Sequence, residues 1–139
     1  MRTGFTLIEM LIVLTVMAVM AGISTPALLG MRDRITVRLA AVDAARTLAD
    51  ARSVALTASR RTAVRIDQIT NTLTVVSGPD TIRTLQLSEY GVQLRTTRDS
   101  IAFGPTGIGW GAATATITIT RGRASTALAV SRLGRIRRS

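Results

Sequence analysis

The sequence predicts an α+β protein in which one long N-terminal helix packs on antiparallel β-sheets. An apolar run over 5–29, amphipathic spacing over 30–60 and alternating residues over 61–139 support this prediction. The chain has room for the helix and one domain of about a hundred residues. We therefore expect a short leader at 1–4, two helix halves that meet at residue 30, and a β domain from residue 61.

The apolar run contains a single carboxylate, that of Glu9. As a helix, residues 5–29 would extend roughly 37 Å, more than the roughly 30 Å hydrocarbon core of a bilayer, so the run predicts a membrane-spanning segment. A carboxylate inside a membrane costs on the order of 2 to 4 kcal/mol unless it finds a partner. Phe5 lies one helical turn before Glu9, so cleavage after Gly4 would place a new α-amino group near that carboxylate.

Two simpler interpretations of the N-terminus stay open. Ala21 closes an acceptable site for cleavage of a secretory signal peptide, and Arg2 provides a minimal charged region before the apolar run. A plain signal anchor is the other interpretation. Both leave Glu9 without a purpose, and the apolar run continues past Ala21 to Leu29.

Residues 4–9 read GFTLIE and follow a four-residue leader. They resemble the class III signal of type IV pilins and type II secretion pseudopilins. The resemblance implies cleavage between Gly4 and Phe5 by a prepilin peptidase, N-methylation of Phe5, and pairing of Glu9 with the N-terminus of a neighbouring subunit. Pro26 lies where many pilins have a proline that kinks the helix. The implied location is the bacterial inner membrane, with a single pass and the globular domain in the periplasm, and later a periplasmic pseudopilus or surface pilus.

The second half of the helix, 30–60, has apolar residues at three-and-four spacing, which predicts a buried face. The opposite side is charged and is expected to be mostly a solvated face, with Arg46 and Asp50 one turn apart as a weak pair. The expected buried face consists of Met31, Ile35, Leu39, Val42, Ala45, Leu48 or Ala49, and Ala55. The expected solvated face includes Arg32, Arg34, Arg38, Asp43, Arg46 and Asp50.

From residue 62 the period of the apolar residues changes to two, which predicts strands. Residues 77–80, Ser-Gly-Pro-Asp, have the chemistry of a turn. The expected strands lie near 62–67, 73–75, 81–87, 92–96, 113–120 and 125–131, with a short edge strand within 133–138.

Three segments of the chain resemble the GspH/FimT family of minor pseudopilins and minor pilins. They are ARSVA at 51–55, FGPTG at 103–107 and VSRLGRIR at 130–137. The resemblance implies a pilin fold with two antiparallel sheets beside the helix. It also implies a structural subunit of a type II secretion system or a type IV pilus, whose partners are other pilin or pseudopilin subunits and prepilin peptidase.

The composition argues against catalysis. The chain has no histidine, cysteine or lysine, so the usual general base, thiol nucleophile, Schiff-base amine and soft metal ligands are missing. We expect no enzyme activity, no cofactor and no metal. The glycines of 104–111 are expected to form turns rather than a phosphate cradle, because no P-loop lysine is present. Trp110 among them either fills a small core or contacts a partner.

A net charge of +10 favours an anionic partner. The C-terminal region contributes strongly, because no acidic residue follows Asp99. Its ending, GRIR at 134–137, resembles the tail of DNA-binding minor pilins of the FimT type, and this gives an alternative function in which arginines hold double-stranded DNA through its phosphates. An edge strand with its charges in solvent explains the same residues without a ligand. The arginines are Arg121, Arg123, Arg132, Arg135, Arg137 and Arg138.

Overall fold

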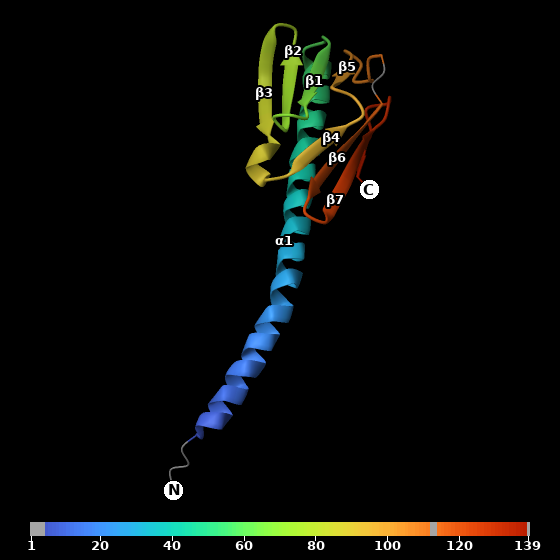
Figure 1. The fold of residues 1–139 in the computed structure, drawn as a ribbon. Helices are drawn as coiled ribbons and strands as arrows, with labels where there is room; N and C mark the ends of the chain where they lie inside the picture. Colours follow the sequence, from blue (N-terminus) through green and yellow to red (C-terminus); the bar gives the residue numbers. More distant parts are fainter. Residues whose placement is uncertain (1–4, 112–113, 139) are drawn as a thin grey trace. The chain divides into compact units, whose positions relative to one another are not determined.

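The computed structural model describes residues 5–111 and 114–138, and forms two compact units, one up to Arg32 and the other from Asp33 onward. The long helix α1 (Leu7–Thr57) is followed by the predicted strands in their expected order and by one further strand, at Ser100–Phe103, that was not predicted (Figure 1). The elements after α1 are β1 (Thr62–Asp67), β2 (Thr72–Ser77), β3 (Asp80–Gln86), the 3-10 helix η1 (Leu87–Tyr90), β4 (Gln93–Thr96), β5 (Ser100–Phe103), β6 (Ala115–Arg121), β7 (Ala124–Val130) and β8 (Ile136–Arg138).

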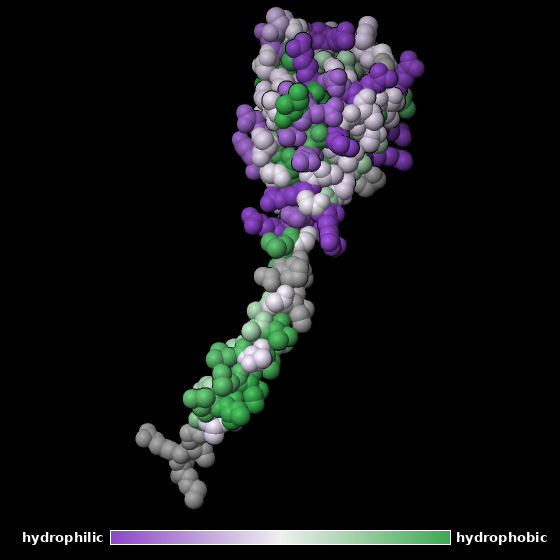
Figure 2. Space-filling view, viewed as in Figure 1, coloured by the Kyte–Doolittle hydropathy of each residue, from purple (hydrophilic) through white to green (hydrophobic). Residues whose placement is uncertain are grey.

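The first unit exposes apolar side chains along the helix. Leu7 is 80% exposed and Met20 is 65% exposed, and Figure 2 shows apolar residues gathered along this part of the chain. In the described part of the chain, no helix combines the length and apolarity needed for a membrane crossing. The single-pass segment expected at 5–29 stays a prediction.

The strands form two four-stranded antiparallel sheets, which confirms the predicted combination of a long helix with antiparallel sheets. One sheet has the order β3-β2-β1-β5 and the other has the order β4-β6-β7-β8. The turn expected at 77–80 connects β2 and β3, with Gly78 at a φ of 63°. The predicted strand 81–87 ends one residue early, because Leu87 begins η1 with its side chain fully buried. The predicted strand 113–120 corresponds to β6, while Ala113 lies outside the described residues.

The buried face of the helix differs from the predicted one. Met31, Ile35, Leu39 and Val42 are about half exposed or more, so their assignment to the core was wrong. Leu48 and Ala55 are buried as expected, but most of the face consists of alanine, whose small side chain leaves room for large side chains from the two sheets. The buried helix residues include Val37, Ala40, Ala41, Ala44, Leu48, Ala51 and Ala55.

The sheets supply the bulky part of this core. Phe103, Leu73, Ile101 and Ile117 are fully buried and belong to the same cluster as the alanines of α1. The interior is filled by large side chains from the strands and small side chains from the helix. The sheets therefore determine which helix residues are buried. Apart from Phe103, the buried core is aliphatic, as the scarcity of aromatic residues indicates.

Candidate functional site

The residues predicted to act in processing and assembly lie where α1 begins. Gly4 is outside the described residues, whereas Phe5 is 74% exposed just before the helix. Thr6 and Glu9 form a reciprocal cap: the Glu9 amide donates to Thr6 Oγ1, and the Thr6 amide and hydroxyl both donate to Glu9 Oε2, each at 3.3 Å. Helix α1 continues through Pro26, whose side chain is outside the described part, so the expected kink stays a prediction.

The segments that carry the family resemblance meet in space. Arg52, from the end of α1, donates from Nε to the carbonyl oxygen of Gly107 at 2.9 Å. Gly134 has a φ of 72°, and a Cβ at this position would lie 2.9 Å from that same oxygen. The amide of Gly109 donates to the carbonyl of Arg132 at 2.9 Å. The helix end, the glycine-rich loop and the C-terminal tail are therefore one structural junction.

The glycines of the loop serve turns and close contacts, as the turn interpretation predicts. Gly107 and Gly111 have φ values of 71° and 66°, a region that favours glycine. A Cβ at Gly104 would lie 3.1 Å from the ring of Trp110. Trp110 is nonetheless 56% exposed, so it does not fill the core and its indole is open to a neighbour.

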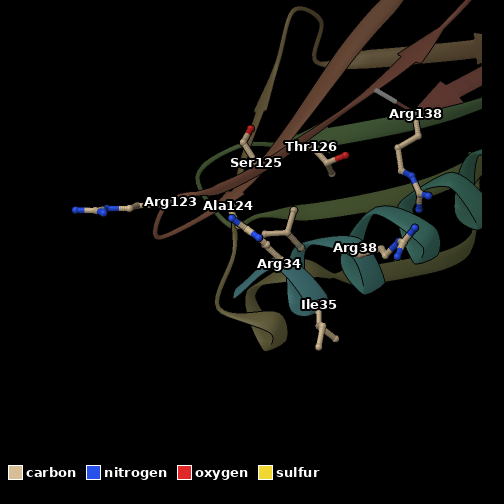
Figure 3. A pocket seen from close by; sticks show the side chains of 9 residues that line it. Arg34, Ile35, Arg38, Arg123, Ala124, Ser125, Thr126 and Arg138 are labelled. Atoms are coloured by element: carbon tan, nitrogen blue, oxygen red, sulfur yellow. The ribbon is translucent and has the colours of Figure 1, made fainter. Parts of the chain in front are cut away.

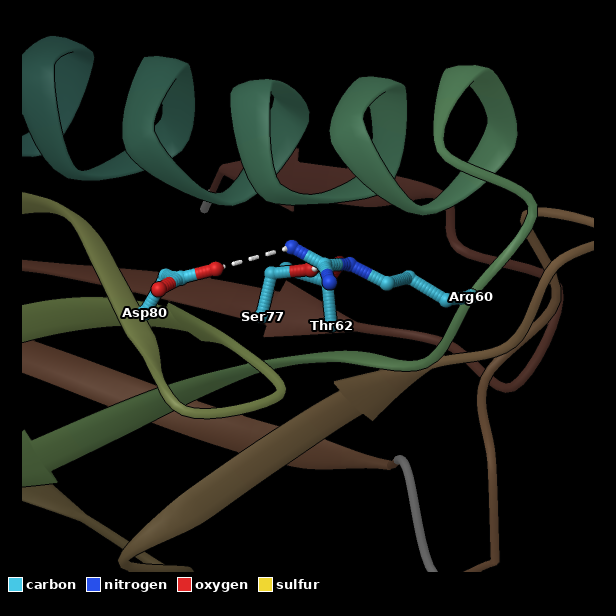
Figure 4. A network of polar contacts seen from close by, with 4 residues as sticks. All are labelled: Arg60, Thr62, Ser77 and Asp80. Atoms are coloured by element: carbon cyan, nitrogen blue, oxygen red, sulfur yellow. Dashed lines mark hydrogen bonds and ion pairs between the residues drawn. The ribbon is translucent and has the colours of Figure 1, made fainter.

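The second unit also contains a structural network of polar side chains at the end of the helix. Arg60 donates from Nε to Ser77 Oγ at 2.8 Å and pairs with Asp80 at 3.3 Å, while the Thr62 hydroxyl donates to the same Ser77 oxygen (Figure 4). Ser77 and Thr62 are buried. The network ties the segment after α1 to the β2–β3 turn. In the described residues no three potential ligands gather as a metal site.

The three carboxylates of α1 from Asp33 onward all bond to the strands and η1. Asp33 pairs with Arg121 at 3.0 Å, and Asp50 pairs with Arg83 of β3 at 2.6 Å. The hydroxyl of Tyr90 donates to Asp43, and this hydrogen bond, followed by burial, raises the pKa of Tyr90 above its usual 10.0. The expected pairing of Asp50 with Arg46 was wrong, because a better-placed arginine reaches Asp50 from the sheet.

Arg121 is consequently a structural residue. Its Nη1 also donates to the carbonyl of Tyr90, and at the β6–β7 turn a Cβ on Gly122 would lie 2.5 Å from Asp33 Oδ2. Assigning Arg121 to an anion-binding tail was wrong, because a carboxylate 88 positions earlier in the chain neutralises it.

The other C-terminal arginines are distributed over two grooves and one further exposed position. Arg123 and Arg138 line a groove of about 480 Å³ with Arg34 and Arg38 of α1 (Figure 3). In that view Arg38 and Arg138 point toward one another while Arg123 points away. Arg135 and Arg137 line a second groove, and Arg132 is exposed and lines neither. Anion binding by these five arginines stays a prediction.

Sequence reasoning missed the arginines of the helix. Arg34 and Arg38 were assigned to a solvated face, and Arg52 was noticed only as part of a motif. A helical projection contains the missing signal, because Asp43 and Asp50 fall on one side of α1 while these arginines fall on another. The sequence alone does not reveal that β8 lies along the arginine side.

The chain matches known pilin-like proteins in its N-terminus and in its fold. A model of the prokaryotic N-terminal methylation motif matches residues 1–25. The type IV minor pilin FimU of Pseudomonas aeruginosa has a similar structure, with a TM-score of 0.64 at 18% identity, covering 75% of this chain and 88% of that one. The minor pseudopilin EpsH of the type 2 secretion system of Vibrio cholerae has a TM-score of 0.60 at 17% identity, covering 74% and 95%.

A second crystal form of FimU gives a TM-score of 0.62 at 17% identity, covering 73% of this chain and 91% of that one. No curated protein matches the chain in sequence. The chain therefore combines a prokaryotic N-terminal methylation motif with the fold of these minor pilin and minor pseudopilin structures, which is the fold that the resemblance implied. At these identities the structural likeness establishes the fold.

Proposed function

We propose that this chain is a minor pilin or minor pseudopilin, a structural filament subunit rather than an enzyme. The observation that carries the proposal is a methylation motif at residues 1–25 on a chain with the pilin fold. In this proposal a prepilin peptidase cleaves between Gly4 and Phe5 and the new amino group of Phe5 is methylated. The chain waits in the bacterial inner membrane as a single-pass protein, with its globular part in the periplasm, and then enters a periplasmic pseudopilus or a surface pilus.

Glu9 would act as the registration residue during assembly. Both hydrogen bonds that its carboxylate accepts from Thr6 go to Oε2 at 3.3 Å, which leaves Oε1 for an incoming ammonium group. The carboxylate would cost on the order of 2 to 4 kcal/mol in an apolar environment without such a partner. A subunit whose N-terminus lies beside the Glu9 of its neighbour removes that cost, so a misplaced subunit is penalised.

The apolar helix surface would supply the packing between subunits. Each large aliphatic side chain that becomes fully buried contributes about 1.5 to 3 kcal/mol. Exposed residues that fit this role include Leu7, Ile8, Leu11, Leu14, Met17 and Met20. This apolar packing is nonspecific, so the register between subunits would depend on the Glu9 carboxylate.

The test replaces Glu9 by alanine in the full chain, expressed with the other components of its filament system. Leader removal and membrane fractionation should stay normal, whereas the share of subunits recovered in sheared filaments should fall. Glu9→Asp is the matched variant, since it retains the charge at a shorter reach. Normal incorporation of Glu9→Ala would contradict the registration role.

Double-stranded DNA is the alternative partner, and the exposure of five C-terminal arginines favours it: Arg123, Arg132, Arg135, Arg137 and Arg138. If about four arginines neutralise phosphates, log affinity should fall with log salt at a slope near −3.6. Replacing Arg135 and Arg137 by glutamine should flatten that slope. Unchanged DNA retention by this double variant would remove DNA capture as a function.

A further inference from the structure

In the second unit, the acidic residues of helix α1 lie on a different side of the helix from its groove-lining arginines. Its carboxylates at Asp33, Asp43 and Asp50 bond to Arg121, Tyr90 and Arg83. On the flank beside β7 and β8, by contrast, the grooves contain arginines and no acidic residue. The positive charge on this flank is therefore not neutralised by the residues that line it.

Three grooves follow one another along this flank. The first is lined by Arg34 and Arg38, the next by Val42 and Ala45, and the last by residues from Ala49 to Leu56. Strand β8 contributes to the opposite wall of all three grooves, since Arg138 lines the first two and Ile136 lines the last two. From residue 34 to residue 56 a helix rises roughly 33 Å, so the three form one elongated site. We call it the α1–β8 groove, with Arg34, Arg38, Val42, Ala45, Ile136 and Arg138 as its central residues.

The groove has an apolar middle and cationic ends. Val42, Ala45, Leu128 and Ile136 contribute to the middle. One end has Arg38 and Arg138, whose side chains point toward one another (Figure 3). The other end has Arg135, near Arg52 and Leu56 at the end of the helix. A ligand that fits the whole length must combine apolar groups with negative charge.

Strand β8 provides an open sheet edge in this groove. It is the last strand of its sheet and pairs with β7 alone among the described strands. The amide of Ser131 donates to the carbonyl of Arg135, and Ala129 stands opposite Arg137. Since antiparallel pairs alternate, the main-chain N–H and C=O groups of Ile136 and Arg138 point toward the open edge. These groups can receive another strand.

We propose that the α1–β8 groove binds an extended acidic segment of another polypeptide, which adds to the edge of β8. Main-chain hydrogen bonds to Ile136 and Arg138 would hold the segment in register, as in strand addition. Its carboxylates would meet Arg38 and Arg138 at one end and Arg135 at the other. Its apolar side chains would cover Val42 and Ala45. This binding surface goes beyond the filament role proposed above, and does not depend on it.

The partner is a different protein rather than a second copy. Of the carboxylates in this chain from residue 33 onward, Asp33, Asp50 and Asp80 are in ion pairs. Asp43 and Asp67 accept hydrogen bonds, Asp99 accepts one from Gln68, and the seventh carboxylate, that of Glu89, lies in the 3-10 helix η1 rather than in a strand. A chain with net charge +10 offers no free acidic strand to its own copies.

A nucleic acid fits the groove less well. No aromatic side chain lines it, so bases would find nothing to stack on. The apolar middle of the groove would face the charged backbone of the nucleic acid. The donor and acceptor groups on the open edge of β8 alternate, as pairing with a polypeptide strand requires. An acidic peptide satisfies all three features at once.

The test uses the full chain in detergent micelles and a fluorescent peptide of about ten residues, with glutamates near both ends and valines in the middle, a length typical of a long strand. Fluorescence anisotropy gives the Kd. The double variant Arg38→Gln/Arg138→Gln should raise the Kd about tenfold or more, because charge-assisted hydrogen bonds are lost. The control Arg95→Gln/Arg98→Gln makes the same charge change on the opposite edge of the sheet, and should stay within about twofold.

A second measurement changes the probe and leaves the protein intact. One peptide is N-methylated at every odd position and another at every even position. Because one strand edge uses the amides of alternate residues, one of these two probes should lose binding while the other retains it. This contrast identifies main-chain pairing separately from charge.

Three outcomes would overturn the proposal. One is equal weakening by the groove variant and the control, and another is equal binding of the two methylated probes. The third is that a duplex oligonucleotide or a vesicle of anionic phospholipid displaces the peptide and is itself weakened by Arg38→Gln/Arg138→Gln. Filament incorporation of Glu9→Ala is measured independently, so failure of either proposal leaves the other standing.

Discussion

Arg52 Nε donates a hydrogen bond to the carbonyl oxygen of Gly107, at 2.9 Å and across 55 positions of the chain. The backbone of Gly134 lies against the same pair, with room for no side chain. Three segments that look like separate motifs in the sequence therefore act together. The contact fixes where β8 begins, and hence the wall of the α1–β8 groove.

Replacing Arg52 by glutamine should lower the free energy of unfolding by about 1 to 2 kcal/mol, since the Gly107 carbonyl loses its donor. Urea unfolding of the full chain in micelles, followed by the fluorescence of Trp110, measures this change. Arg46→Gln is the matched control, because Arg46 is an exposed arginine on the same helix. Equal stability of the two variants would show that the Arg52 contact contributes nothing.

Gly134→Ala should destabilise more than Gly111→Ala. Both glycines have a positive φ, 72° and 66°, so both alanines cost about 1 kcal/mol of backbone strain. Only at Gly134 would the new Cβ also lie 2.9 Å from a backbone oxygen and 3.0 Å from Arg52 Nε. The difference between the two unfolding free energies isolates the close contact. A larger loss at Gly111 would contradict the geometry.

Arg121 and Arg123 should differ sharply although they are two positions apart. Arg121→Gln removes the ion pair with Asp33 and a bond to the Tyr90 carbonyl, and we expect a loss of about 1 to 2 kcal/mol for this partly exposed pair. Arg123→Gln should stay within about 0.5 kcal/mol, as is usual at exposed positions. Thermal unfolding of the two variants, which have the same net charge, measures the contrast. A loss of stability in Arg123→Gln but not in Arg121→Gln would contradict the structural role of Arg121.

The bond between Tyr90 and Asp43 should make stability fall at high pH. The pKa of Tyr90 is raised in the folded chain, first by its hydrogen bond to Asp43. A raised pKa means that this contribution is complete below the unfolded value of about 10, and is lost as pH rises through the folded value. Thermal unfolding between about pH 8 and pH 11 should therefore show a steeper decline for the parent than for Tyr90→Phe. Parallel profiles would exclude the contribution.

The sequence predicts most of the strands and their turns, because alternation and turn chemistry are local. It missed β5, whose last three residues are all buried and therefore do not alternate. The β2–β3 turn at Gly78 and the antiparallel order of β6 and β7 follow directly from such patterns. The sequence does not predict which charged residues pair with one another. Asp33 and Arg121 are 88 positions apart, and only the packing of the β6–β7 turn beside the helix brings them together. The split of the C-terminal arginines has the same cause, since β8 brings Arg138 to Arg38 while Arg135 lies at the other end.

The helix face was predicted wrongly because two sets of residues satisfy the same three-and-four spacing. Size distinguishes them in the structure, since Ala44 is fully buried and Leu39 is 54% exposed. Ala44→Leu should therefore destabilise the chain by about 1 to 3 kcal/mol through overpacking. Leu39→Ala should stay within about 0.5 kcal/mol, as an exposed substitution does. Urea unfolding of both variants in micelles measures this, and a greater loss for Leu39→Ala would restore the face that hydrophobicity alone predicts.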